Sequence, residues 1–307
     1  MKKTESIHRK SIFYILAAAV FWGCSGAFFK ELSVYGFGTM QVVFIRTSVA
    51  TVILGSWLLI KDREAFKVKW RDAWCFAGTG LFSLLLFNWC IYEAIELNGI
   101  AVSFVLLYTA PAFVAVLSAL LFQEKLNLPR WCTLIIVLAG CALVSGIMGV
   151  TDVSMIGVAF GLGSGFGYAL YSIFGRYALN RNYRPQTIAF YTFTLCAAGS
   201  AALSLITTGN DFQFPALNTN ILLYSLLLGS AGCVFPYVLY TKGLANVTGA
   251  QASMTATLEP VVATAIGVFI YNETLSIWQG LGATLIIGSI LLLSQTSKND
   301  VNKGNHS

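Results

Sequence analysis

Long apolar stretches constrain the fold of this chain more than any other feature. Each is about as long as the roughly 20 residues that a helix needs to cross a bilayer, and short polar or charged segments separate them. Charged residues make up only 10% of the chain, against about 25% in soluble domains. The sequence therefore predicts an all-α integral membrane protein. Ten spans are predicted near residues 11–32, 38–60, 73–96, 99–122, 131–147, 155–177, 187–207, 220–241, 248–270 and 277–295.

The positive charges predict how these spans are oriented. If the N-terminus is cytoplasmic, 17 of the 19 Lys and Arg residues fall in the tails and connections on the cytoplasmic side. Lys30 alone falls on the opposite side, and Arg46 lies within the second span. Because cytoplasmic loops retain positive charge, we expect both termini in the cytoplasm and the chain in the plasma membrane. The net charge of +6 then faces the lipid bilayer, and no basic stripe indicates nucleic-acid binding.

Several function classes lack the residues that they need. The sequence has no GxxxxGK[ST] phosphate loop, and the ten spans leave no room for a soluble nucleotide-binding domain. The only two histidines, His8 and His306, lie in the polar tails, and the seven cysteines lie in apolar segments without a CxxC pair. We therefore expect no enzyme activity, no metal site and no cofactor.

The chain also contains an internal repeat. Pro111 precedes Glu124 by 13 residues, and Pro260 precedes Glu273 by the same spacing. The two halves, 1–150 and 151–307, hold five predicted spans each, so the second half enters the membrane in the opposite direction. The connection 61–71 has five basic residues, whereas its counterpart, 207–218, has none. Inverted repeats of this kind are typical of secondary transporters, whose binding site lies between the repeats near the membrane midplane.

Several segments carry a family resemblance. They are FWG at 21–23, Arg46, LYTAPAFVAVLSALLFQEKL at 107–126, LEPVVATAIGVFIYNETL at 258–275, Gly140 and Gly288. With these segments the chain resembles the EamA family of the drug/metabolite transporter superfamily. The resemblance implies two inverted five-helix repeats around a central cavity. It also implies export of amino acids, related metabolites or toxic compounds.

The ninth predicted span carries the most informative candidates. Glu259 and Pro260 lie near its middle, where a carboxylate is costly unless it faces a cavity or a partner. Gln251 and Thr255 share a helix face with Glu259. We expect this face to line the cavity, with Glu259 binding an ammonium group or a proton. The alternative is a protonated glutamate that bonds a neighbouring helix.

Other spans supply further candidates. Pro111 is the repeat equivalent of Pro260, and Tyr108 lies beside it. Arg46 either snorkels to the surface, pairs with a carboxylate or contacts an anion, and Trp22 either packs or borders a ligand. The expected substrate-binding residues are Trp22, Asn88, Tyr92, Tyr108, Pro111, Tyr168, Tyr171, Tyr240, Gln251, Thr255, Glu259 and Pro260.

Together these features predict a secondary transporter that exports a small metabolite by alternating access. Proton coupling through Glu259 is a hypothesis within that prediction. The alternatives are a channel or sensor and, less favoured, a lipid-modifying membrane enzyme. Saturable counterflow would separate a carrier from both. Neither the identity of the small-molecule substrate nor the oligomeric state follows from the sequence.

Overall fold

The fold was derived from a computed structural model, which describes residues 2–124, 128–147, 152–208, 218–272 and 274–303. All regular elements within these ranges are helices. The α-helices are α1 (Lys2–Val34), α2 (Thr39–Lys61), α3 (Ala73–Ala77), α4 (Leu86–Leu107), α5 (Ala110–Phe122), α6 (Leu128–Val144), α7 (Met155–Asn180), α8 (Pro185–Thr208), α9 (Thr219–Gly229), α10 (Phe235–Leu244), α11 (Gly249–Ala256), α12 (Leu258–Tyr271) and α13 (Ile277–Lys303). Two short 3₁₀ helices, η1 (Arg63–Phe66) and η2 (Trp70–Asp72), and two π-helical segments, η3 (Gly78–Leu85) and η5 (Ser230–Val234), complete the set.

The helices are long and apolar enough for a multi-pass membrane protein. Seven helical segments in the described part of the chain meet the length and composition of a membrane span, and three shorter apolar helices accompany them. The segment Trp70–Leu107 is 38 residues long, but Gly99 interrupts it with a φ of 72° and a ψ of 174°. The predicted all-helical membrane architecture is therefore confirmed. The count of ten spans stays a prediction.

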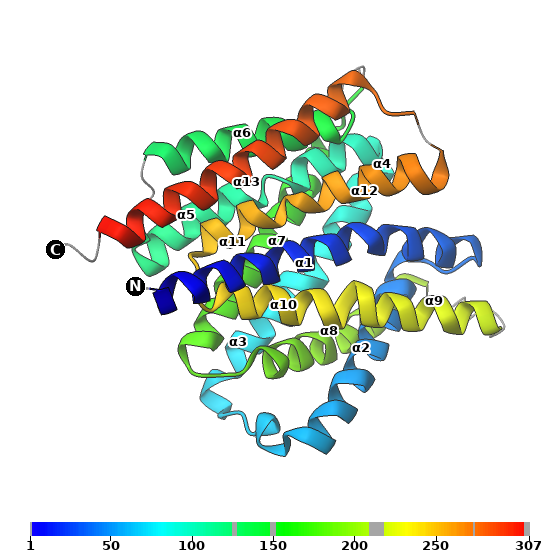
Figure 1. Ribbon diagram of the computed structural model, residues 1–307. Coiled ribbons are helices and arrows are strands. Elements are labelled where there is room, and N and C mark those ends of the chain that lie inside the picture. Colours follow the sequence, from blue (N-terminus) through cyan, green and yellow to red (C-terminus); the bar gives the residue numbers. More distant parts are fainter. Residues whose placement is uncertain (1, 125–127, 148–151, 209–217, 273, 304–307) are drawn as a thin grey trace.

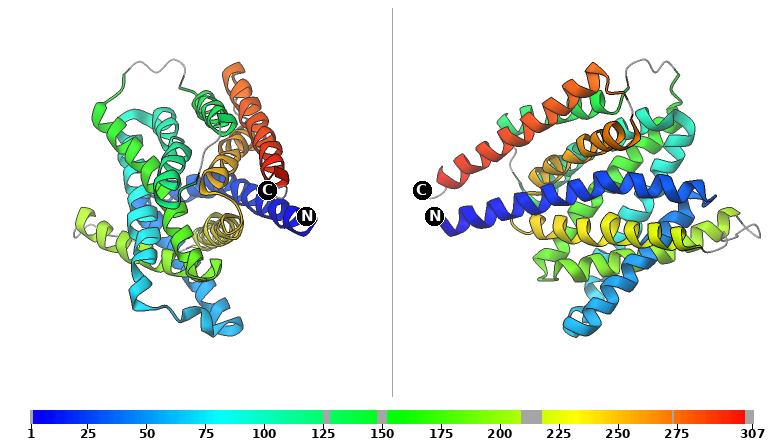
Figure 2. Two further views of the ribbon diagram at one scale, coloured as in Figure 1. Left: turned by 90° about the vertical axis from the view of Figure 1, so that its left-hand side faces the viewer. Right: turned by 45° about the vertical axis from the view of Figure 1, so that its right-hand side comes forward.

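The helices form a layered bundle (Figure 1). Helix α1 runs through its middle, and α10 and α12 pack on either side of α1. The α6–α13 pair packs beyond α12, and the α2–α8 pair lies at the opposite end of the bundle. In each view of Figures 1 and 2, the start of α1 and the end of α13 lie close together on one side.

Small residues allow the closest helix approaches. Helix α7 packs against α4 and α5 through its glycines. A Cβ at Gly161 would lie 2.5 Å from a methyl group of Leu106, and one at Gly165 would lie 2.9 Å from the Leu106 carbonyl oxygen. Neither position has room for a side chain, so these glycines set the distance between α7 and its neighbours.

Irregular backbone recurs at equivalent places in the two halves. Helices α4 and α5 are separated after Tyr108 (φ −73°, ψ 6°), and α11 and α12 are separated at Thr257 (φ −67°, ψ 2°). These residues are 149 positions apart. So are Gln123 and Asn272, which end α5 and α12 in the left-handed conformation, and so are the last residues of η3 and η5. The repeat seen in the sequence is thus also a repeat of helix breaks.

The proline positions explain the two breaks. Pro111 and Pro260 lie in the first turns of α5 and α12, where the missing N–H has no helical partner to lose. The predicted boundary between residues 150 and 151 lies outside the described residues, and so does Glu273.

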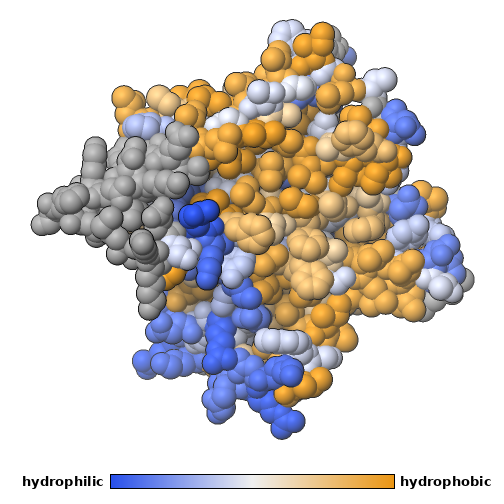
Figure 3. All heavy atoms as spheres, in the orientation of Figure 1, coloured by the Kyte–Doolittle hydropathy of each residue, from blue (hydrophilic) through white to orange (hydrophobic). Residues whose placement is uncertain are grey.

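Apolar and hydrophilic side chains occupy different parts of the molecular surface. Apolar side chains cover most of the face in Figure 3, and hydrophilic ones gather at its lower left. The exposed side chains of Arg63, Lys67 and Arg71 belong to this polar end of the bundle. An apolar band with a basic end is the surface that a membrane-spanning bundle needs.

Candidate functional site

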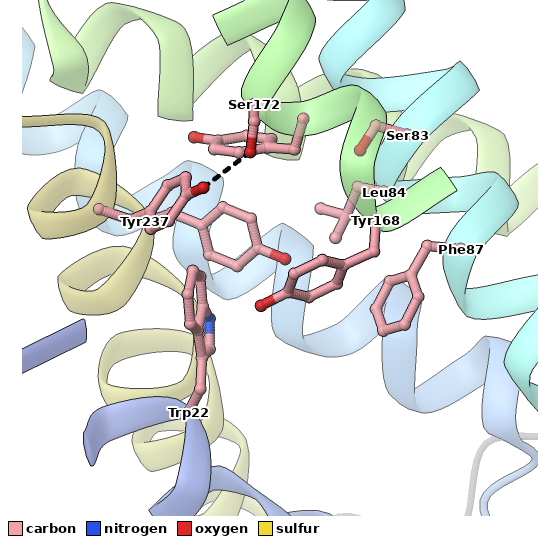
Figure 4. Close-up of a pocket in the computed structure, with 9 residues that line it drawn as sticks. Trp22, Ser83, Leu84, Phe87, Tyr168, Ser172 and Tyr237 are labelled. Atoms are coloured by element: carbon pink, nitrogen blue, oxygen red, sulfur yellow. Dashed lines mark hydrogen bonds between the residues drawn. The ribbon is translucent and has the colours of Figure 1, made fainter. Parts of the chain in front are cut away.

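A small pocket lies between α1, η3, α4, α7 and α10. The space among its lining atoms, counted together with the solvent onto which it opens, measures about 280 Å³. Figure 4 shows Trp22, Phe87 and Tyr168 converging on this space from three different helices. Its lining consists of Trp22, Ser83, Leu84, Phe87, Tyr168, Tyr171, Ser172, Tyr237 and Tyr240.

Aromatic rings form most of the pocket wall. The Trp22 ring centroid lies 6.1 Å from that of Tyr168, 5.2 Å from Tyr237 and 5.4 Å from Tyr240. Tyr171 contacts Tyr237 edge-on at 5.0 Å. Such rings offer apolar faces for the body of a ligand and favourable positions for a cation.

Some polar groups of the pocket wall have hydrogen-bond partners within the protein, and others do not. Tyr240 and Ser172 share a hydrogen bond of 2.7 Å, and Tyr171 shares one of 2.8 Å with Thr241. These two bonds tie α7 to α10. The Tyr237 hydroxyl and the Trp22 indole N–H have no hydrogen-bond partner in the described parts of the chain. The pocket therefore keeps polar groups that a ligand can use.

Glu259 lies beside the pocket. Tyr168 donates a hydrogen bond of 3.3 Å to its carboxylate, so one pocket residue connects the acid to the aromatic wall. Glu259 occupies the first turn of α12, directly after the break at Thr257. The positive end of the helix dipole lies there and favours a negative charge.

Arg46 and Asn88 form a second polar pair, between α2 and α4. The guanidinium donates to the Asn88 side-chain oxygen at 2.5 Å, and the Asn88 amide donates to the Leu84 carbonyl at 2.6 Å. The partner of Arg46 is thus an amide rather than a carboxylate. Asn88 faces α2 and lies behind the pocket wall, one helical turn from Leu84.

The candidates from the fourth predicted span lie away from the pocket. Tyr108 is buried in a separate apolar cluster with Val137, Cys141 and Ile286. Pro111 is buried in the first turn of α5. Both residues pack around the α4–α5 break.

The remaining candidates also lie outside the pocket lining. Gln251 is buried and shares a hydrogen bond of 3.3 Å with the His8 ring, and Thr255 donates to the Gln251 carbonyl. Pro260 is buried at the start of α12, and half-buried Tyr92 packs against the largest apolar cluster. Of the twelve expected binding residues, the structure therefore brings four into the lining: Trp22, Tyr168, Tyr171 and Tyr240.

Five lining residues were not among the sequence candidates. Tyr237 lies three positions before Tyr240 on the same helix face, and this i, i+3 spacing was the signal that could have identified it. Ser172 is likewise four positions after Tyr168. Ser83, Leu84 and Phe87 surround the end of η3, where a π-helical turn changes which face points inward. The sequence carried no clear signal for these three.

A layer of polar contacts joins the helix ends on the side of the chain termini. Glu124 pairs with Arg176 at 3.5 Å and accepts from the Gly249 N–H at 3.4 Å, while Arg176 also donates to the Val247 carbonyl. Nearby, Arg181 pairs with Asp72 at 2.9 Å. These contacts hold the ends of α5, α7 and α11 together.

Comparisons with known proteins agree with the fold and the repeat. An uncharacterized transporter of Bacillus subtilis (strain 168), YxxF, is 25% identical over 95% of this chain and 93% of its own length. A second from the same organism, YwfM, is 24% identical over 92% of each chain. A solved structure described as "Crystal structure of protein" superposes with a TM-score of 0.79, at 16% identity, over 94% of this chain and 98% of that one. The EamA-like transporter family matches residues 9–146 and again residues 155–295, so the chain belongs to that family.

Proposed function

We propose that the protein is a secondary transporter of the plasma membrane that exports small amphipathic metabolites, amino acids or related compounds. The observation that carries this proposal is the aromatic pocket with Glu259 at its edge, held there by Tyr168 at 3.3 Å. Aromatic faces suit the apolar body of such a solute. A carboxylate within the membrane suits its ammonium group or a proton.

The proposed mechanism is alternating access between two inverted five-helix repeats. The apolar runs of the sequence support ten spans, and the lysine and arginine distribution supports cytoplasmic termini. The equivalent breaks near Tyr108 and Thr257 support it, because broken helices in both repeats give two places where helix segments can reorient. The contacts of Glu124 with Arg176 and Gly249 join α5, α7 and α11 on the side of the chain termini. Export then requires these contacts to open so that a cytoplasmic solute can enter.

Counterflow in proteoliposomes tests this proposal. We would load a mixed pool of amino acids and metabolites and identify the exchanged solutes by mass spectrometry. We expect saturable exchange that falls at least about tenfold in Glu259→Gln, because the charge that binds an ammonium group or proton is lost. Glu64→Gln is the matched control, since Glu64 is an exposed carboxylate paired with Lys67 far from the pocket.

The outcomes separate the alternatives. Exchange that does not saturate would favour a channel. Full uphill transport by Glu259→Gln under a pH gradient would exclude proton coupling through this residue. Folded protein that exchanges nothing from a broad cell extract would overturn the transporter proposal.

A further inference from the structure

Arg46 carries a positive charge that no described acidic residue balances. Its guanidinium donates to the neutral amide of Asn88 at 2.5 Å, and its Nε is buried without a hydrogen-bond partner in the described part of the chain. The four ion pairs found there involve Lys67, Arg176, Arg181 and Arg184. Arg46 is thus a membrane-embedded cation in need of an anion.

Asn88 cannot supply that anion, and its geometry keeps the guanidinium in place. The Asn88 amide nitrogen donates to the Leu84 carbonyl at 2.6 Å, which leaves its oxygen directed at Arg46. One N–H of the guanidinium is therefore satisfied by a fixed acceptor. A guanidinium has five N–H donors, and a carboxylate can accept from two of them in parallel.

The guanidinium lies just behind the pocket wall. Leu84, whose carbonyl anchors Asn88, lines the pocket, and so does Tyr237. Arg46 belongs to α2, and α2 packs against η5, which leads directly into the helix that carries Tyr237. The Tyr237 hydroxyl has no hydrogen-bond partner among the described residues. In Figure 4 the Trp22 indole nitrogen lies on the side of its ring that faces Tyr168. Free donors thus border the pocket, and an unbalanced cation lies directly behind its wall.

We propose that Arg46, together with the Tyr237 hydroxyl, forms an anion subsite that takes a carboxylate group of the transported solute. This inference rests on the proposed function of the pocket as the substrate site. Glu259 is connected to the pocket wall through Tyr168, whereas Arg46 is connected to it through Asn88 and Leu84. The two charged groups therefore approach the pocket through different wall residues. A solute bound between them directs its acidic group toward α2.

A pair of probes that differ only in the carboxylate tests the subsite. We would measure the binding of L-phenylalanine and L-phenylalaninamide to the full-length protein in detergent, by thermal stabilisation and by competition. In the wild type we expect the acid to bind at least about tenfold more tightly than the amide, because an Arg–carboxylate pair in a water-poor site is strong. Arg46→Gln should bring the ratio close to one, and Arg46→Lys should keep part of the preference.

Asn88→Asp provides a second variant that retains Arg46. It places a carboxylate where the guanidinium now meets an amide oxygen, so the internal ion pair should compete with the ligand and also abolish the preference. Arg63→Gln is the matched control, because Arg63 is exposed and donates only to the Leu59 carbonyl. It should leave the ratio unchanged.

Three results would overturn the subsite: equal binding of both probes by the wild type, binding of neither probe, or an unchanged preference in Arg46→Gln and Asn88→Asp. Failure of the subsite and failure of the proposed transport function give different results. Selective binding without counterflow would leave the subsite and remove the carrier, whereas counterflow without discrimination would leave the carrier and remove the subsite.

Discussion

The two helix breaks share a backbone but differ in chemistry. At the α4–α5 break, the residue before the proline is Ala110, which is 2% exposed and packs with Val114 and Ala169. At the α11–α12 break, the equivalent residue is Glu259, half-buried and hydrogen-bonded to Tyr168. One break is sealed by apolar contacts, and the other presents a carboxylate. Under the proposed function, ligand contact belongs to the second break and packing to the first.

The largest expected effect comes from moving the carboxylate to the sealed break. Ala110→Glu would bury an acid that has no partner in the apolar contacts of Val114 and Ala169. We expect the midpoint of thermal unfolding to fall by about 5 °C or more, because an unpaired buried charge costs several kcal/mol. Ala110→Met adds similar volume without charge, and its midpoint of thermal unfolding should fall clearly less. Equal losses in both variants would mean that volume, rather than charge, distinguishes the two breaks.

The second-largest effect should come from replacing the prolines, and it should differ between the two breaks. Pro260→Ala allows α11 and α12 to join, which would rotate Glu259 away from Tyr168. We expect the exchange rate to fall by about tenfold, since small misplacements of a binding group are costly. Pro111→Ala relaxes the other break, which packs against apolar residues, and should lower the exchange rate about twofold to threefold. Initial rates of counterflow in proteoliposomes measure both. A larger loss for Pro111→Ala would reverse the comparison.

The smallest effect should come from single hydroxyl groups. Tyr168→Phe removes the donor that positions Glu259, and we expect the apparent affinity to weaken about fivefold, because a single hydrogen bond contributes about 1 kcal/mol. Tyr108→Phe changes a residue buried among Val137 and Cys141 and should have an effect below about twofold. Concentration dependence of exchange gives both values. If Tyr108→Phe weakened affinity more, the apolar cluster would have to open onto the substrate path.

The helical architecture could be predicted from the sequence because apolar length alone signals a membrane span. The predicted spans 99–122 and 248–270 are unbroken, yet their breaks near Pro111 and Pro260 could have been predicted, since proline removes a backbone donor wherever it lies. The breaks at Gly78–Leu85 and Ser230–Val234 could not. Neither segment contains a proline, and a π-helical turn depends on how neighbouring helices pack.

The candidate site was only partly accessible to sequence reasoning. Four expected residues line the pocket: Trp22, Tyr168, Tyr171 and Tyr240. Their sequence signal is an aromatic side chain within a predicted span. Asn88 was expected on the same face as the pocket, yet it lies behind the wall and pairs with Arg46. A helix face predicted at 100° per residue shifts when a π-helical turn precedes it. Contacts between distant helices, such as Tyr168 with Glu259, have no signature within either segment.

The repeated helix irregularities have a consequence for how such a chain can diversify. Both halves keep the π-helical segment, the break near the proline and the left-handed residue that ends the following helix. Only one half carries the carboxylate, and only one carries the intramembrane guanidinium of Arg46. The two halves therefore share their backbone irregularities but differ in the charged side chains that they carry. A chain of this kind can acquire a new cargo by exchanging a few side chains while the backbone that moves them stays the same.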